Sequence, residues 1–277
     1  MEIKERYTGL LTDLQNYLDF AIDVSDATAG RKGVPWRQIR AHQFYIRMTV
    51  TCMSLLRLLP GNRIARGHFD FWDFPAVANL TRTFIEAYHN FFYVGVDNVN
   101  DDESKFRLSI FNYYVNVEKY RLYTEFGVPE AELQDFKINI PMARKSLEDD
   151  PLFGIIPDNL KKPIKNGKVF MYLTQNQVAQ RLSIPSHGFA GFYRFLSNQI
   201  HATPFSVFSQ SDTRGRGLEN EIEVIYIVMC MDFVLKYLVM AIDEMINIFP
   251  DCESKLDAAK LNVIRGILSE MKHVDNV

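Results

Sequence analysis

The stretch Val224-Ile-Tyr-Ile-Val-Met-Cys-Met-Asp-Phe-Val-Leu-Lys-Tyr-Leu-Val-Met-Ala-Ile242 is apolar on almost every side of a helix. Its two charged residues, Asp232 and Lys236, stand four apart and therefore face the same side. Charges in the middle of a bilayer are costly, so this pattern favours the central core helix of a globular protein over a membrane span. We therefore expect a fold built around this helix, and no membrane partner.

Helical periodicity also governs the segments on both sides of this stretch. Apolar residues recur every three or four positions, and glycine, proline and capping residues such as Asp73 mark the ends. The expected helices are about 2–26, 35–59, 73–95, 101–127, 186–203, 219–249 and 254–272, with a short one ending at residue 183. The predicted fold class is all-α, an antiparallel helical bundle of six or seven main helices that forms a single domain over residues 1–277.

The section from about residue 128 to 185 is less regular, because five prolines between residues 129 and 163 interrupt it. Within it, Ile164-Lys-Asn-Gly-Lys-Val-Phe-Met171 places Asn-Gly between residues of strand character. Asn-Gly in that setting is a strong signal for a two-residue hairpin turn. We therefore predict that this irregular insertion contains a small β-hairpin and does not form a second domain.

The composition limits the classes of function. Hydrophobic residues make up 47% of the 277 residues and charged residues 23%, which predicts a globular core. The net charge of −3 excludes the basic footprint of general nucleic-acid binding, so any RNA contact must be local. Three cysteines without metal-like spacing argue against a disulfide framework, and the N-terminal residues lack the apolar run of a signal peptide. We expect a cytoplasmic protein with no cofactor.

One expected helix, His187-Gly-Phe-Ala-Gly-Phe-Tyr-Arg-Phe-Leu-Ser-Asn-Gln-Ile-His201, carries polar residues on an otherwise apolar sequence. Arg194 and His201 are separated by almost two helical turns, so both leave the same face. Ser197 lies between them on that face, and Asn198 follows as a candidate binding residue. A cation, a hydroxyl and an imidazole in line suit a phosphate site with an acid–base histidine. They equally suit a buried clamp in which the serine and histidine only cap main-chain groups.

A second polar stripe lies in Thr81-Arg-Thr-Phe-Ile-Glu-Ala-Tyr-His89. Arg82, Glu86 and His89 stand at i, i+4 and i+7 on a helix that is apolar almost all round. One interpretation is an Arg82–Glu86 ion pair that fixes the helix register. The other places this stripe opposite the 194–201 stripe, so that both line one polar pocket and the three residues bind a ligand.

A metal site is a further alternative. Glu86-x-x-His89 matches half of a ferritin-like di-iron site, in which two such pairs combine with carboxylates from two other helices. Glu270-x-x-His273 is a second copy, and Glu118 is a candidate extra carboxylate. Four-residue matches of this kind arise easily by chance, so a di-metal carboxylate protein is the least favoured of the hypotheses.

Arg194-x6-His201 resembles the Arg-x(4–6)-His motif of the HEPN superfamily of helical bundles. Many of its members are metal-independent ribonucleases of toxin–antitoxin, CRISPR and phage-defence systems. Phe195 follows the arginine here, where members often carry a polar residue. The resemblance implies an RNA substrate and a homodimer in which two such helices line a shared cleft.

A second resemblance covers more of the chain. Leu80-Thr-Arg-Thr-Phe-Ile-Glu86 together with Tyr193-Arg-Phe-Leu-Ser-Asn-Gln-Ile-His201 is similar to a bacterial all-helical family of unknown function. That family has an Arg-x3-Glu helix and a later Leu-Ser-x3-His helix. It implies that the two polar stripes belong together and supplies no activity.

Three function hypotheses follow. In the first, the protein is a metal-independent ribonuclease in which His201 shuttles a proton, Arg194 holds the scissile phosphate and Ser197 orients it. In the second, it is a non-catalytic helical protein that binds a small anion or a partner with the same residues. In the third, it is the di-metal carboxylate protein.

Overall fold

The computed structural model describes residues 2–62, 70–184, 186–208 and 214–274, without the side chains of residues 186–187 and 271–274. The chain forms two compact units, Met1–Val96 with Gln175–Val277, and Asp97–Thr174. In the described ranges every element of regular secondary structure is a helix, which confirms the all-α prediction. The only pairing of β type among these residues is one isolated bridge between Trp72 and Gly217.

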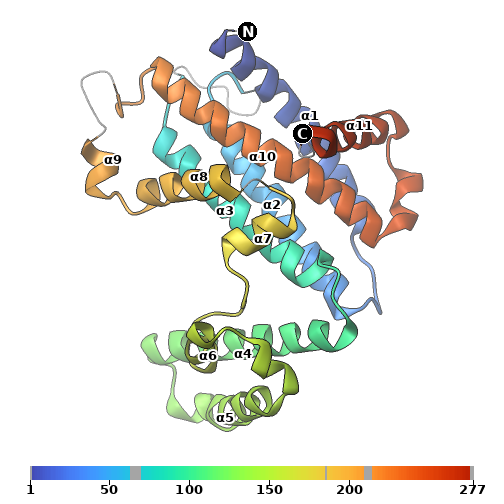
Figure 1. Cartoon of the computed structure of the whole chain (residues 1–277), viewed down its shortest axis with the longest axis vertical. Helices are drawn as coiled ribbons and strands as arrows, with labels where there is room; N and C mark the ends of the chain where they lie inside the picture. Colours follow the sequence, from blue (N-terminus) through green and yellow to red (C-terminus); the bar gives the residue numbers. More distant parts are fainter. Residues whose placement is uncertain (1, 63–69, 185, 209–213, 275–277) are drawn as a thin grey trace. The chain divides into compact units, whose positions relative to one another are not determined.

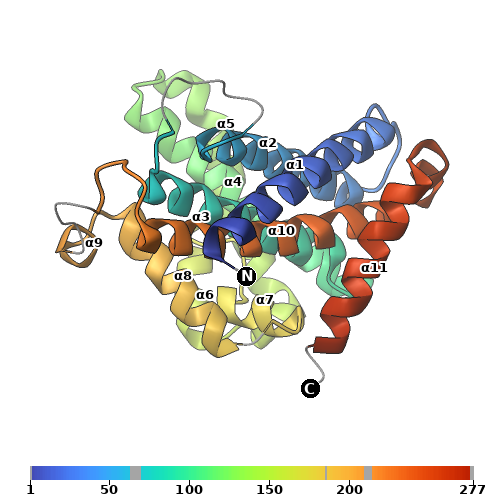
Figure 2. The same cartoon turned by 90° about the horizontal axis from the view of Figure 1, so that it is seen from above.

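The first unit holds the long core helices (Figure 1). Its elements are α1 (Ile3–Thr28), α2 (Trp36–Leu58), α3 (Phe74–Phe91) with a π-helical turn (Phe92–Val96), α7 (Gln175–Arg181), α8 (Ser186–Ile200), α9 (Pro204–Phe208), α10 (Glu221–Ile248), a 3-10 turn (Pro250–Lys255) and α11 (Ala258–Val274). Helix α3 packs against α2, α8 and α10, and α1 packs against α2 and α10. Figure 2 shows α1 and α10 crossing above α3.

Local chemistry explains where the helices around the candidate site begin. The carboxylate of Asp73 accepts a hydrogen bond from the Ala76 amide at 3.0 Å, and Pro75 occupies the first turn of α3. The amide oxygen of Asn220 accepts from the Ile222 amide at 3.0 Å and caps α10. Both caps satisfy main-chain donors that would otherwise lack partners at a helix N-terminus.

Helix α10 contains the apolar stretch 224–242. By length and composition it is the one described helix that could cross a membrane, and 56% of its most apolar window is buried inside the protein. Val234, Leu238 and Ile242 have no exposed surface, and Tyr237 is equally enclosed. Its packing against α1, α2, α3 and α11 gives these residues apolar neighbours within the first unit.

The second unit contains α4 (Asp101–Glu125), a 3-10 turn (Glu130–Leu133), α5 (Gln134–Asp149), a second 3-10 turn (Pro151–Ile155) and α6 (Asp158–Lys165). It begins earlier than the predicted insertion, because α4 packs with α5 and belongs to the same compact unit. Pro141 and Pro163 lie inside α5 and α6, although the sequence suggested that prolines would break this section into irregular pieces.

The predicted hairpin at residues 164–171 is wrong. Ile164 belongs to α6, and the Asn-Gly pair ends that helix. Gly167 has φ +57°, and its amide donates to the Ile164 carbonyl at 2.8 Å, while the Lys168 amide donates to the Pro163 carbonyl at 2.9 Å. A left-handed glycine that closes the last helical carbonyls is the usual helix C-terminal motif. Asn-Gly supplies the same backbone conformation in both settings, so the sequence alone favoured the wrong one.

A buried arginine holds the second unit together at both of its ends. The Arg107 side chain is 2% exposed; its Nη1 lies 2.8 Å from Asp97 Oδ2 and its Nη2 lies 2.7 Å from Glu103 Oε1. Its Nε donates to the Tyr172 hydroxyl at 3.2 Å, and that hydroxyl donates to Glu103 at 2.6 Å. Asp97 and Tyr172 come from opposite ends of the unit, so one guanidinium joins its two ends.

Replacing this arginine should destabilise the protein strongly. Arg107→Ala leaves two partly buried carboxylates without their cation, and loss of one partner of a buried ion pair costs about 3–5 kcal/mol. Urea unfolding of the full chain measures the change. Arg144→Ala, which removes an exposed partner of Glu148, is the control and should cost less than about 1 kcal/mol. Equal effects of the two substitutions would contradict this account.

Candidate functional site

Helices α3 and α8 meet through a polar network. Arg82 Nε donates to Glu86 Oε1 at 2.9 Å, one turn further along α3. Its Nη1 donates to Ser197 Oγ at 2.5 Å and its Nη2 to the Tyr193 hydroxyl at 3.2 Å, both on α8. The Tyr193 hydroxyl in turn donates to Glu86 Oε1 at 2.6 Å. The Arg82–Glu86 ion pair and the contact between the two stripes are therefore both present.

The electrostatics of this network favour its fixed arrangement. The guanidinium carbon of Arg82 lies 4.7 Å from the centre of the Tyr193 ring, which adds a cation–π contact. Burial, together with the hydrogen bond to Glu86, raises the pKa of Tyr193 to about 12, so the hydroxyl keeps its proton and donates it. The Arg82 side chain is 17% exposed, and each of its three nitrogens donates one of these bonds.

Arg194 and His201 take no part in this network. Both are exposed, and neither side chain has a hydrogen-bond or ion-pair partner among the described residues. His201 follows the last residue of α8, and its amide still donates to the Ser197 carbonyl at 3.3 Å. That bond continues the helical spacing, so the His201 side chain leaves one turn beyond Ser197. The structure thus provides a free cation and a free imidazole beside the paired groups.

Asn198 serves the turn after α8. Its amide nitrogen donates to the Arg194 carbonyl at 3.0 Å, and its amide oxygen accepts from the Thr203 hydroxyl at 2.9 Å. Ala202 has φ +43°, a left-handed conformation that redirects the chain into α9. Both polar groups of Asn198 are therefore engaged in holding this turn.

His89 faces a different direction from the other residues of its stripe. It has no exposed surface; its Nδ1 lies 2.5 Å from Gln175 Oε1 and its Nε2 lies 2.9 Å from the Tyr237 hydroxyl. Burial lowers the pKa of His89 to about 4, against the weaker opposing effects of Gln175 and Glu86, so the imidazole is neutral at pH 7. The structure places this histidine inside the core, where it joins α3 to α7 and α10.

The residues proposed as metal ligands do not lie together as a metal site among the described residues. Glu86 contacts Arg82 and Tyr193, His89 contacts Gln175 and Tyr237, and Glu118 pairs with Arg121. His273 lies outside the described side chains. Within the described part of the chain, no three His, Cys, Asp or Glu side chains are placed to hold a metal ion together.

The role of Tyr193 is not evident from the sequence, because a tyrosine on an apolar helix looks like a core residue. Tyr193 stands four residues before Ser197, so both side chains face α3. Phe195 points elsewhere: its ring lies 5.4 Å from that of Phe74 and 4.9 Å from that of Tyr226. It occupies the position after Arg194 as a packing residue.

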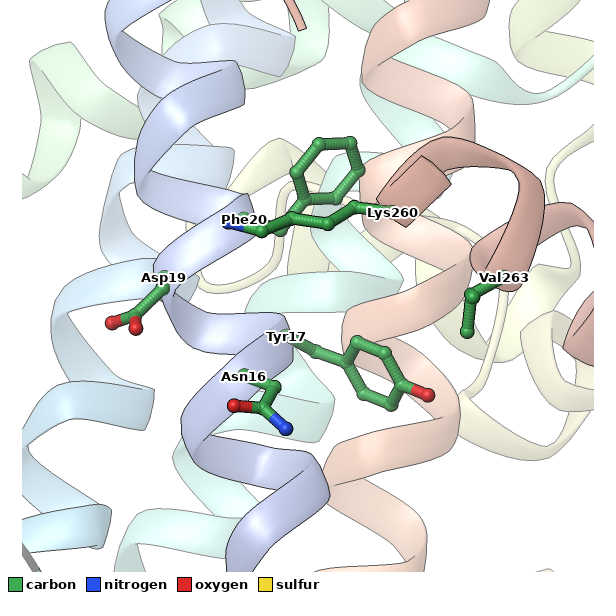
Figure 3. A pocket seen from close by; sticks show the side chains of 6 residues that line it. All are labelled: Asn16, Tyr17, Asp19, Phe20, Lys260 and Val263. Carbon is green, nitrogen blue, oxygen red and sulfur yellow. The ribbon is translucent and has the colours of Figure 1, made fainter. Parts of the chain in front are cut away.

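The first unit also has a hollow that no predicted residue lines. Figure 3 shows it between α1 and α11, with the rings of Tyr17 and Phe20, the aliphatic Val263 and the cation of Lys260 around it. Its volume of about 250 Å³ lies below the usual range for ligand pockets, roughly 300–1,000 Å³. Lys260 Nζ lies 3.4 Å from Asp23 Oδ2. The hollow therefore offers less functional chemistry than α8.

Searches of the chain against protein-family models, against curated proteins and against solved structures found no match. No relative therefore assigns a role to any residue of the site. Its chemistry has to be judged from the exposed and the paired groups of α3 and α8.

Removing one hydroxyl should loosen the network. Tyr193→Phe leaves Glu86 and Arg82 each without one partner and should lower the free energy of unfolding by about 1–2 kcal/mol. A double-mutant cycle with Glu86→Gln should show a coupling energy of about 0.5–3 kcal/mol. Tyr226→Phe is the control, because no hydrogen bond of its hydroxyl occurs among the described residues. Additive effects of the two site substitutions would disprove the coupling.

The neutral state of His89 predicts a pH dependence of stability. The unfolded chain protonates this side chain below about pH 6.5, and the folded protein does so only below about pH 4. Unfolding therefore takes up a proton between these values, so stability falls as the pH falls through this window. The loss is on the order of 3 kcal/mol.

Urea unfolding of the wild type and of His89→Gln between pH 4 and 7 isolates this contribution. The difference in unfolding free energy between the two proteins should shrink as the pH decreases, because only the wild type carries the imidazole. Parallel stability curves would show that His89 is not held in its neutral form.

Proposed function

We propose that the protein is a metal-independent ribonuclease whose site is the exposed face of α8. The observation that supports the proposal is that the polar residues in and directly after this helix fall into a paired group and an exposed group. Tyr193 and Ser197 are fixed to α3, whereas Arg194 and His201 are exposed and free of partners among the described side chains. A rigid helix that presents an uncommitted cation and imidazole suits catalysis on a phosphodiester.

The chemistry needs little else from the protein. The ribose 2′-oxygen forms a bond to the neighbouring phosphorus while the bond from phosphorus to the 5′-oxygen breaks. His201 accepts the proton of the 2′-hydroxyl, and the leaving 5′-oxygen takes a proton from water. Arg194 binds the phosphate and stabilises the negative charge that builds up on it. The products are a 2′,3′-cyclic phosphate and a 5′-hydroxyl.

The network behind the site has a positioning role. The bond from Arg82 to Ser197 holds the last turn of α8, and His201 directly follows this turn. Ser197 therefore acts through its hydroxyl contact with Arg82 and not on the substrate. The resemblance to HEPN proteins adds the proposal that two copies pair, so that two such helix ends share one cleft in the cytoplasm.

The second candidate is a non-catalytic protein that binds a small anion or a partner through the same face. Phe195 favours it, because its ring is packed between Phe74 and Tyr226 and supplies no polar group beside Arg194. Among the described side chains of α8 and the residue that follows it, His201 is then the one histidine, and binding needs no second one.

Incubation with a mixed-sequence RNA in the presence of EDTA tests the first candidate. The wild type should cleave it and leave 2′,3′-cyclic phosphate ends. His201→Ala should reduce the rate at least about 100-fold, the usual contribution of a general base. Arg47→Ala, an exposed arginine on α2, is the matched control and should cleave at the wild-type rate.

Other outcomes separate the candidates. Binding of RNA without cleavage, weakened by Arg194→Ala, supports the non-catalytic protein. Cleavage that persists in His201→Ala at the wild-type rate would exclude the proposed site. An RNA target that EDTA protects completely would show that the reaction depends on a metal ion.

A further inference from the structure

Helix α9 carries the most exposed aromatic side chain of the described residues. Phe208 is 92% exposed, and Phe205 is 60% exposed. They stand three residues apart in one helix and are therefore neighbours on its surface. Figure 1 shows α9 beyond the end of α8. Two unburied phenylalanines side by side need an explanation beyond packing.

The turn after α8 fixes these rings relative to the candidate site. Thr203 donates its hydroxyl to Asn198, and the Val207 amide donates to the Thr203 carbonyl at 3.1 Å. The Ser206 hydroxyl also donates to that carbonyl at 2.9 Å. Phe205 comes four residues after His201, so the chain between them spans at most about 14 Å. The aromatic pair and the imidazole therefore lie within a short reach of each other along the chain.

The charge of this surface selects a polyanion. Between Asp158 and Asp212 the sequence contains no Asp or Glu, although the whole protein has a net charge of −3. Helices α7, α8 and α9 all lie within this acid-free range and carry Arg181 and Arg194. A polyanion that approaches α8 and α9 meets the cation of Arg194 and aromatic rings, with no carboxylate on either helix.

We propose that Phe205 and Phe208 form a stacking platform for unpaired bases, which makes single-stranded RNA the substrate class of the α8 site. Proteins hold single strands by combining cations along the backbone with aromatic rings under successive bases. Arg194 and His201 meet the phosphates, and the α9 rings meet the bases beside them. A base pair inside a duplex cannot offer its face to such a ring. This inference rests on the proposed ribonuclease function and adds a preference for single-stranded over double-stranded RNA.

Fluorescence anisotropy with labelled 2′-O-methyl RNA tests the platform separately from cleavage, because this RNA lacks the reacting hydroxyl. The wild type should bind the single strand at least tenfold more tightly than the matching duplex. Phe208→Ala should weaken single-strand binding about tenfold, since one stacked base contributes about 5- to 150-fold. Phe208→Trp should restore it. Phe126→Ala removes a phenylalanine of the second unit that is 78% exposed and should change nothing.

The salt dependence separates stacking from charge. Arg194→Ala should reduce the slope of log affinity against log salt by about 0.7, the value for one phosphate contact on a single strand. Phe208→Ala should lower the affinity and leave this slope unchanged. A Phe208→Ala variant whose affinity equals that of the wild type would overturn the platform.

Two further measurements distinguish failure of this inference from failure of the proposed function. His201→Ala should lose cleavage of ordinary RNA and keep Phe208-dependent binding of the 2′-O-methyl strand. Cleavage that is insensitive to Phe208→Ala and to pairing of the RNA would reject the platform and leave the ribonuclease standing. Phe208-dependent sedimentation with phosphatidylserine–phosphatidylcholine vesicles, without strand binding, would assign α9 to a lipid surface and reject the inference.

Discussion

The enclosure of α3 is the constraint on which the first unit depends. This helix packs against α2, α8 and α10, so a buried polar side chain on it can find hydrogen-bond partners only inside the fold. Arg82 and Glu86 find theirs on α8, and His89 finds its partners on α7 and α10. These directional bonds fix the rotation and register of three neighbouring helices around α3, which apolar contacts alone would leave less specified.

The same constraint divides the polar residues of α8 into two groups. Tyr193 and Ser197 are bonded to α3, while Arg194 and His201 are exposed. A helix whose inner side is committed cannot rotate to bury its outer side. The exposed residues are therefore presented in a fixed geometry, which is what a binding or catalytic surface requires.

Much of the fold follows from the sequence, because glycine, proline and capping residues mark most helix ends. Asp73 and the apolar stretch 224–242 predict α3 and α10 nearly to their observed limits. Asn166-Gly167 misleads, since a left-handed glycine ends a helix as readily as it turns a hairpin. The spacing of Arg82 and Glu86 indicates a shared face, but which helix meets that face is a tertiary fact that periodicity does not contain.

The candidate site, too, is only partly predictable from the sequence. The spacing of Arg194 and His201 puts them on one face, yet it cannot tell an exposed face from a buried one. The role of Tyr193 cannot be read from the sequence, because its ring fits the apolar pattern of α8. Only the structure shows that its hydroxyl bonds to Arg82 and Glu86. His89 looks equivalent to Arg82 and Glu86 on a helical projection, and only the positions of Gln175 and Tyr237 show that it is a core residue.

The buried guanidinium at position 107 has a consequence for the history of the chain. The Arg107 side chain binds both Asp97 and Tyr172, which lie near the two ends of the second unit. The two points at which this unit connects to the rest of the chain are therefore close together. A segment whose two ends lie close together can be inserted, deleted or replaced in evolution without changing the path of the surrounding chain. Kin of this protein that lack residues 97–174 altogether, yet keep α3 and α8, are what such an architecture permits.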